Sequence, residues 1–175
     1  MAKRTKKQTL GIVLVLGILV IAVGVLAHLN RGDLELKKEL EMQAEFLLKH
    51  PGGEERVGMQ DILDLAPVEF TTVMRTGAGS RDADFTGVEL RKVLEKFKID
   101  LRADAAVEVK ASDGYTSAFK GEEILEPESV YITIAMDGEA LKPKGEGGFG
   151  PYYLVIRDSE FAQRWVKFME EIIVR

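Results

Sequence analysis

The longest apolar segment of the chain lies near its N-terminus. All 18 residues from 10 to 27 are Leu, Ile, Val, Ala or Gly. A helix needs roughly 20 apolar residues to cross the hydrocarbon core of a membrane, and uncharged neighbours extend this segment to that length. A helix also satisfies its backbone hydrogen bonds internally, which lipid requires. We therefore predict a transmembrane helix over residues 9–29.

The charges around this segment predict its orientation. Residues 1–8 contain four basic side chains, and the first acidic residue of the chain is Asp33. Because basic flanks stay in the cytoplasm, we expect a cytoplasmic tail over 1–8 and an extracytoplasmic C-terminal domain on a single-pass cell-membrane protein. The alternative is a cleaved signal peptide that ends at Val25-Leu26-Ala27. The apolar segment exceeds the about 7–15 residues usual in signal peptides, which favours an uncleaved signal anchor.

After this segment, apolar residues recur with helical spacing. They are Leu36, Leu40, Ala44 and Leu47 or Leu48. The spacing predicts an amphipathic juxtamembrane helix within residues 33–48 that acts mainly as a spacer. Pro51, Gly52 and Gly53 follow it and are typical of a helix end. We assign residues 30–56 to this helix and a linker, and residues 57–175 to one compact domain.

The pattern within residues 57–175 mixes short strands with short helices. Strand-like patterns occupy 68–74, 106–111, 115–119, 130–135, 152–157 and 171–174. Helical spacing occupies 59–65, 88–97 and 161–169. Gly-rich segments at 76–84 and 144–150 predict loops, and the two Asp-Gly pairs at 113–114 and 137–138 predict turns. Strands in hairpins with interspersed short helices indicate an α+β domain with mixed sheets.

The charge of the domain excludes one class of function. The chain has 24 basic and 29 acidic residues, but five of the basic ones lie within the first 31 residues. The remainder therefore carries 19 basic against 29 acidic side chains, a net charge near -10. Nucleic-acid binding requires a basic face for the phosphates, so no nucleic-acid partner is expected.

The residue types needed for several kinds of catalysis are missing from the domain. There is no cysteine, which excludes disulfides, thiolate metal ligands and cysteine nucleophiles. The two histidines, His28 and His50, lie at the predicted membrane edge and beside the Pro-Gly-Gly segment, so neither suits a catalytic triad. Asp82 and Asp84 could hold a hard cation weakly, but a hydrated turn explains them better. We predict neither catalytic residues nor a metal site.

Several motifs follow one another in a fixed order through the domain. They lie at 61–65, 85–90 with 93–94, 107–109 with 111–115, 136–141, 148–156 and 164–167. Together they resemble the oxidoreductase molybdopterin-binding domain of the sulfite oxidase type, over about residues 57–175. The resemblance implies the sulfite-oxidase-type molybdopterin-binding fold, in a short relative that lacks cysteine. The transmembrane helix predicted above precedes this domain.

The resemblance also implies a cofactor, and the sequence departs from it at one position. Enzymes of that family hold a molybdenum–pterin cofactor, transfer oxygen atoms and bind the metal through a cysteine thiolate. The cysteine belongs within residues 73–77, where Met74 offers only a neutral thioether, a weak ligand. Tyr153 stands where the family tends to place an arginine, and Arg164 matches its cofactor-contacting stretch near the C-terminus.

These correspondences nominate four cofactor-binding residues: Arg75, Tyr115, Tyr153 and Arg164. Arg75, like Arg81, flanks the loop where the family places its metal, so we expect anion contacts there. Each residue also has a plainer explanation, namely solvated arginines and a packed tyrosine. The lone tryptophan, Trp165, is expected to anchor the core.

Three functions remain open from the sequence. We favour a non-enzymatic, membrane-tethered binding or interaction domain without molybdenum. It would present loops 75–84 and 142–151 to a small anionic or pterin-like ligand, or to a protein partner. The second is a molybdopterin-dependent oxidoreductase, or a subunit of one, without the usual cysteine ligand. The third is a structural subunit of a larger membrane complex.

Overall fold

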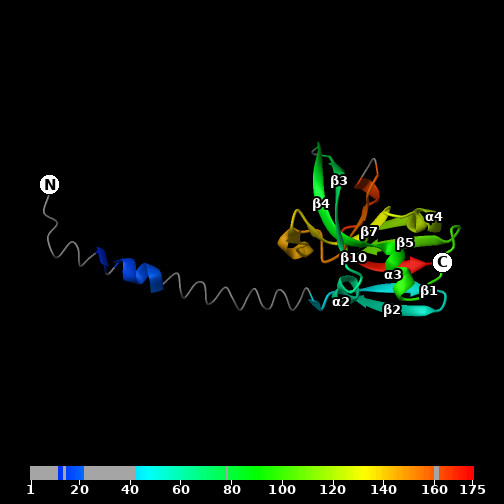
Figure 1. Cartoon of the computed structure of the whole chain (residues 1–175), viewed down its shortest axis with the longest axis horizontal. Coiled ribbons are helices and arrows are strands. Elements are labelled where there is room, and N and C mark those ends of the chain that lie inside the picture. The colour runs from blue at the N-terminus through cyan, green and yellow to red at the C-terminus, as the bar shows by residue number, and fades with distance from the viewer. Residues whose placement is uncertain (1–11, 14, 22–41, 78, 160–161) are drawn as a thin grey trace. The chain divides into compact units, whose positions relative to one another are not determined.

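The computed structural model describes residues 12, 13, 15–21, 42–77, 79–159 and 162–175. The chain divides into two units, Met1–Glu41 and Met42–Arg175 (Figure 1). In the first unit, residues 12, 13 and 15–21 are helical. Within the described part of the chain, no helix is both long and apolar enough to cross a membrane. Most of the predicted span at 9–29 lies outside that part, so the anchor stays a prediction.

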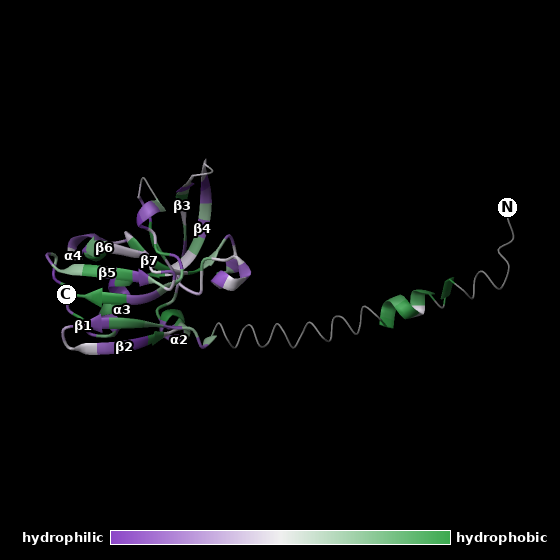
Figure 2. Ribbon diagram, turned by 180° about the vertical axis from the view of Figure 1, so that it is seen from behind, coloured by the Kyte–Doolittle hydropathy of each residue, from purple (hydrophilic) through white to green (hydrophobic). Residues whose placement is uncertain are grey.

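The second unit contains a five-stranded sheet in which the first and last strands are neighbours. Its order is β2 (Gly53–Gly58), β1 (Glu45–His50), β10 (Met169–Val174), β5 (Ala106–Ala111) and β6 (Thr116–Lys120). β1 and β10 run parallel, and the other pairs are antiparallel. β2 lies at the edge and is mostly hydrophilic, as Figure 2 shows. An edge strand with charged side chains resists pairing with other chains.

A second five-stranded sheet carries the hairpin that matters for the site. Its order is β3 (Val68–Thr76), β4 (Gly79–Glu89), β7 (Val130–Met136) and β8 (Glu139–Ala140), and β9 (Tyr153–Ile156) also pairs with β7. β3 and β4 pair along their length, from Val68 opposite Gly87 to Thr76 opposite Gly79. The far end of this hairpin projects from the rest of the unit (Figure 1).

Short helices and turns connect these strands. They are α2 (Met59–Leu63), α3 (Leu90–Lys96), α4 (Gly121–Leu125) and the 3₁₀ turns η1 (Lys144–Glu146) and η2 (Ala162–Arg164). In α2 the Asp61 carboxylate accepts a hydrogen bond from the Gly58 amide at 3.0 Å, and Glu123 does the same for Lys120 in α4 at 2.9 Å. These bonds satisfy amides that the helix start leaves without partners.

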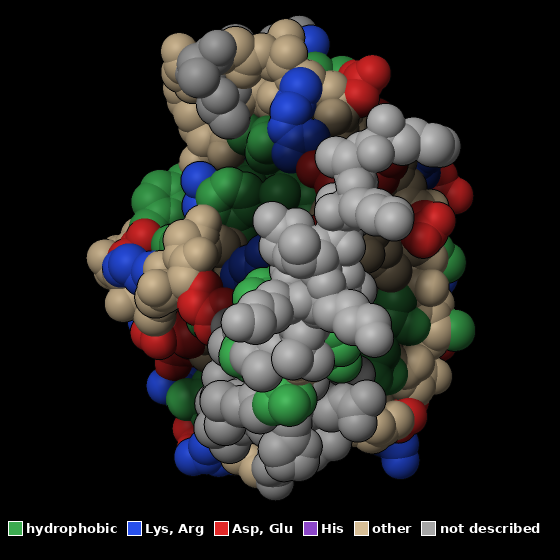
Figure 3. All heavy atoms as spheres, turned by 90° about the vertical axis from the view of Figure 1, so that its left-hand side faces the viewer, with side chains coloured by type: hydrophobic (Ala, Val, Ile, Leu, Met, Phe, Trp, Pro, Cys, Tyr) green, Lys and Arg blue, Asp and Glu red, His purple; other side chains and the backbone are tan. Residues whose placement is uncertain are grey.

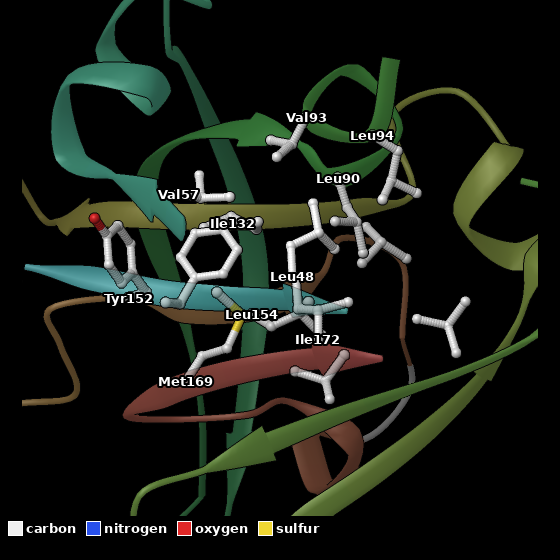
Figure 4. Packing of buried hydrophobic residues seen from close by; sticks show 14 of the residues in the cluster. Leu48, Val57, Leu90, Val93, Leu94, Ile132, Tyr152, Leu154, Met169 and Ile172 are labelled. Carbon is white, nitrogen blue, oxygen red and sulfur yellow. The ribbon is translucent and has the colours of Figure 1, made fainter. Parts of the chain in front are cut away.

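The hydrophobic interior forms two clusters. The larger one joins side chains from β1, β2, α3, β7, β9 and β10, as Figure 4 shows. Leu48, Leu90 and Ile172 in it are fully buried, and each such burial contributes about 1.5–3 kcal/mol. The smaller cluster is rich in aromatic side chains, with Phe85, Tyr153 and Trp165 among its members. It lies beneath the β3–β4 hairpin and forms the base of the candidate site.

The juxtamembrane helix predicted within residues 33–48 is wrong at its C-terminal end. Residues 45–48 belong to β1, with Phe46 and Leu48 buried and Leu47 only partly so. Pro51 and Gly52 form the turn from β1 to β2 instead of ending a helix. The sheet therefore includes residues assigned above to the linker. The part of the predicted helix at 33–41 lies outside the described residues.

Two further predictions need correction. Residues 79–84, predicted as loop, are strand, because β3 pairs with them throughout. The predicted helix at 161–169 is absent from its described residues, which form η2, an isolated β-bridge at Val166 and a turn that leads into β10. The strands predicted at 68–74, 106–111, 115–119, 130–135, 152–157 and 171–174 and the helices at 59–65 and 88–97 are confirmed, with shifted ends. Mixed sheets with a few short helices are therefore confirmed, and α4 was not predicted.

Candidate functional site

A cavity of about 630 Å³ lies between the end of the β3–β4 hairpin and the chain around η2. This volume is in the range of sites for small organic ligands. On the face drawn in Figure 3, apolar side chains gather below the hairpin, with Lys or Arg side chains beside them. The cavity is lined on the hairpin side by Met74, Arg75, Gly77, Gly79 and Ser80. On the opposite side it is lined by Phe149, Tyr153, Ala162, Gln163 and Lys167.

The hairpin supplies one wall of the cavity. Arg75 pairs with Ser80 across the two strands, and both side chains are exposed. The preceding residue, Met74, also lines the cavity, but it is only 8% exposed and packs in the aromatic cluster. Gly79 has φ of +130°, a conformation that only glycine adopts easily, and it lets the strands turn tightly here.

The opposite wall is aromatic. The Phe149 and Tyr153 rings lie with their centroids 5.5 Å apart, and Trp165 lies behind Tyr153 at 5.9 Å. Tyr153 is 1% exposed, and burial raises the pKa of its hydroxyl well above the ordinary value of 10.0. The hydroxyl is therefore neutral at ordinary pH. The indole nitrogen of Trp165, behind it, is buried and has no hydrogen-bond partner among the described residues.

Lys167 lies at the cavity and was not nominated from the sequence. Its ammonium nitrogen lies 4.2 Å from the centroid of the Phe149 ring, a cation–π contact. Arg75 is the other cation of the lining, and the described lining residues include no carboxylate. Lys167 belongs to the motif at 164–167 that carries the family resemblance, but the helix predicted at 161–169 gave no reason to place it at a ligand site.

Tyr115 does not line the cavity but holds one of its walls. Its hydroxyl donates a hydrogen bond to the backbone carbonyl of Gln163, a lining residue. The Asp113 carboxylate accepts a hydrogen bond from the Tyr115 amide at 3.1 Å, which fixes the turn between β5 and β6. Tyr115 thus connects the first sheet to η2.

Arg164 is directed away from the cavity. Its guanidinium contacts both carboxylate oxygens of Glu123, donates to the Ala118 carbonyl at 2.8 Å and lies 4.7 Å from the centre of the Phe119 ring. These hydrogen bonds from Arg164 lower the pKa of Glu123 below its ordinary value. Arg164 therefore anchors η2 to β6 and α4, and only Arg75 and Tyr153 of the four nominated residues line the cavity.

The other sequence candidates lie outside the cavity. Arg81 pairs with Asp137 at 2.8 Å and donates to the backbone carbonyl of Asp82. The hydrogen bond from Arg81 is the main reason that the pKa of Asp137 is lowered. Among the residues that the structure describes, no group of three or more acidic or histidine side chains is arranged to hold a metal ion. The segment 142–151 contributes Phe149 alone to the lining.

The donor atoms around the cavity bear on the cofactor that the fold implies. The sequence contains no cysteine, and the sulfur nearest the expected ligand position belongs to Met74, which is packed in the core. A neutral thioether does not replace a thiolate on molybdenum. The residues present therefore do not fit a metal centre bound through a protein thiolate. Basic and aromatic side chains are present instead, and they suit an organic anion.

Comparisons with known proteins agree with this architecture. The structure of the sulfane dehydrogenase SoxCD from Paracoccus pantotrophus has a similar fold, with a TM-score of 0.64 and 15% sequence identity. The match covers 77% of this chain and 38% of that chain, so this chain spans well under half of that protein. No curated protein matches the sequence. The family model for the oxidoreductase molybdopterin binding domain matches residues 35–175, which include β1 and β2. The chain therefore belongs to the oxidoreductase molybdopterin-binding domain family.

Proposed function

We propose that this protein is a membrane-anchored, extracytoplasmic binding domain that holds a small anionic ligand in its cavity and works without molybdenum. One observation carries the proposal. A ligand-sized cavity lies where the hairpin of the fold ends, yet no residue of the whole chain can provide a thiolate to a metal there. The scaffold of the family is retained, whereas the chemistry that its metal needs is not.

The lining supports binding rather than catalysis. Tyr153 is neutral at ordinary pH, because burial disfavours its anion. Arg75 and Lys167 are basic side chains of the lining, and positive charge beside apolar walls attracts an anion. Apolar walls from Met74 and Phe149 exclude water from the contact, which strengthens each polar interaction.

The alternative that family membership favours is a molybdopterin-dependent oxidoreductase, or a subunit of one, that binds its cofactor without a protein thiolate. A partner protein that contacts segments 75–84 and 142–151 would complete such a site. The alternative predicts stoichiometric metal in the native protein.

Metal and pterin analysis of the native protein separates these two functions. The full chain is purified in detergent from its own host, and molybdenum per chain is measured by inductively coupled plasma mass spectrometry. Pterin fluorescence is measured after oxidative release. A molybdenum enzyme purified from the same cells serves as the positive control. We expect molybdenum far below one atom per chain; a value near one would refute the proposal and establish the oxidoreductase.

A further inference from the structure

We infer that the groove between α3 and α4 is a contact surface between two copies of this chain, related by a twofold axis. The groove shares none of its described lining residues with the cavity beneath the hairpin. The inference therefore goes beyond the proposed function and does not depend on the ligand. It follows from an exposed leucine, from the balance of charges along the groove and from the acidity of the rest of the domain.

The groove has an apolar floor and one exposed apolar side chain. Its volume is about 440 Å³. Leu94, Ile99 and Leu101 line it and are each at most 8% exposed. Leu125, the last residue of α4, also lines the groove but is 40% exposed. Burial of this leucine in the same groove of a second molecule would remove its apolar surface from water, which is favourable.

The end of α3 places a lysine in the groove at a cost to the backbone. The amides of Lys98 and Ile99 donate hydrogen bonds of 2.9 Å to the Glu95 and Leu94 carbonyls, which closes the helix. Lys98 has φ of +56°, the left-handed conformation in which helices usually end with glycine. A lysine is strained there, and its side chain is exposed in the groove. The helix end itself does not require a lysine.

The charges of the groove are balanced, whereas those of the domain are not. Its lining contains two basic and two acidic side chains, namely Arg91, Lys98, Glu95 and Asp100. Arg91 is paired with Glu89 at 2.6 Å. Within the described part of the chain, neither Lys98 nor Asp100 forms an ion pair. Residues 32–175 carry 29 acidic and 19 basic side chains, so two copies repel each other over most of their surfaces.

This balance identifies a second copy as the occupant. In a twofold contact a surface meets itself, so it must contain charges of both signs. The described lining of the cavity beneath the hairpin has cations and no carboxylate, and the hollow beside Asp84 and Asp137 has carboxylates and no cation. Either surface would repel its own copy. In the α3–α4 groove, Lys98 of one copy can instead meet Glu95 and Asp100 of the other.

The lack of cysteine makes this contact directly testable. Glu126, exposed directly after Leu125, is replaced by cysteine in the full chain. Membranes from cells that express this chain are treated with a short bifunctional maleimide, and denaturing electrophoresis measures the covalent dimer. Membranes are used because a contact of this size is weak in dilute solution. We expect a dimer from Glu126→Cys and little from Ser112→Cys, on an exposed turn outside the groove; equal yields would overturn the inference.

Two leucines of equal exposure test the apolar part of the contact. In the Glu126→Cys chain, Leu125→Gln should lower the dimer yield about tenfold, because its burial between the copies is lost. Leu63→Gln is the control, since Leu63 is 39% exposed at the end of α2 and does not line the groove. It should leave the yield unchanged. If both substitutions act alike, Leu125 does not enter a second copy.

Substitutions of Lys98 test the charged part. Lys98→Glu should lower the yield about tenfold or more, because carboxylates then face each other. Lys98→Gly should also lower it, yet it relieves the helix end and should keep the thermal midpoint equal or higher. This variant separates association from folding. An unchanged yield in Lys98→Glu would contradict the inference.

Complementary variants test the twofold geometry itself. One chain carries Lys98→Glu, and a second, of different tag length, carries Glu95→Lys with Asp100→Lys. Each alone should give little dimer, whereas together they should give a mixed dimer, because opposite charges meet again on both sides of the axis. Failure of this rescue would exclude the pairing of Lys98 with the acidic rim. None of these yields depends on the ligand or on molybdenum, so the proposed function stands or falls separately.

Discussion

Arg164 and Glu123 form a two-pronged ion pair between η2 and α4, with 2.7 Å from Nη1 to Oε2 and 3.2 Å from Nη2 to Oε1. The same guanidinium bonds the Ala118 carbonyl and covers Phe119. Segments 41 positions apart in the chain are thereby held together beside the cavity. A flat guanidinium can make all these contacts at once, and an ammonium cannot.

We predict that Arg164→Lys lowers the free energy of unfolding by about 1 kcal/mol, because the parallel bonds and the ring contact are lost. Urea denaturation followed by circular dichroism measures the change. Arg102→Lys is the control, since Arg102 makes two bonds to Asp104 but both side chains are largely exposed. Exposed pairs contribute little. Equal effects of the two substitutions would show that η2 does not depend on Arg164.

The buried carboxylate of Glu89 predicts a pH dependence of stability. Burial opposes its ionisation, but hydrogen bonds from Arg91, the Glu128 amide and Lys92 outweigh that effect and lower its pKa to about 2. The unfolded chain, with the ordinary value of 4.5, therefore takes up the proton more readily. The stabilisation is complete above about pH 5 and is lost as pH falls toward 2.

Between pH 7 and pH 3, this group should account for a loss of about 2 kcal/mol in the free energy of unfolding. Urea denaturation at both pH values measures it. Glu89→Gln should be less stable at pH 7 and should lose correspondingly less on acidification. Glu126→Gln, an exposed glutamate nearby, should behave like the parent chain. An unchanged pH dependence in Glu89→Gln would rule out the assigned role.

The chain beside Phe149 is packed so closely that one glycine is required. A Cβ atom at Gly148 would lie 2.0 Å from the Lys142 carbonyl oxygen. We predict that Gly148→Ala destabilises the domain by about 1–3 kcal/mol, as overpacking does. At Gly145, in the same segment, a Cβ would meet no atom within 4 Å. Gly145→Ala should therefore change the thermal midpoint little; if both variants unfold alike, the close approach is not maintained in solution.

The lack of cysteine offers a direct test of the predicted anchor and its orientation. A single cysteine is placed at Ser112, which is exposed in the turn after β5, or at Thr5 in the predicted cytoplasmic tail. In intact cells, a membrane-impermeant maleimide should label Ser112→Cys and reach Thr5→Cys only after lysis. Carbonate washing should leave the full-length chain with the membranes. A soluble chain shortened by about 27 residues would establish the cleaved signal peptide instead.

Much of the domain was predictable because its signals are local. Buried residues alternate along β5, with Val107, Val109 and Ala111 facing the core, and the strand was assigned correctly. Asp113 and Gly114 marked the turn that follows, and Asp137 and Gly138 the turn after β7. In these segments the period of the pattern and the turn residues agree, so distant contacts were not needed.

The errors occurred where distant partners decide the structure. Residues 45–48 fit a helix by their spacing, but β10 lies alongside them and pairs Leu48 with Ile172. Residues 79–84 are mostly polar and follow the glycine-containing turn at 77–79, but β3 supplies hydrogen bonds along them. Near the C-terminus, the backbone of Val166 exchanges two hydrogen bonds with Leu154, which take the place of helical hydrogen bonds there.

The candidate site was only partly predictable for the same reason. Arg75 and Tyr153 came from family correspondence, and both line the cavity. Arg164 came from the same source, but its contacts to Glu123 depend on α4, which the sequence did not reveal. Lys167 belongs to the motif at 164–167, but the local pattern around a lysine is the same whether it faces solvent or a ligand.

The parallel pairing of β1 with β10 has a consequence for how the sheet forms. β10 is the central strand of its sheet, and it pairs residues that lie far apart in the chain, such as Leu48 and Ile172. β1 and β2 therefore keep an open edge until β10 has docked between β1 and β5. Chains in which β10 fails to dock would leave β1 and β2 apart from β5 and β6, so they should be cleared by proteolysis rather than accumulate.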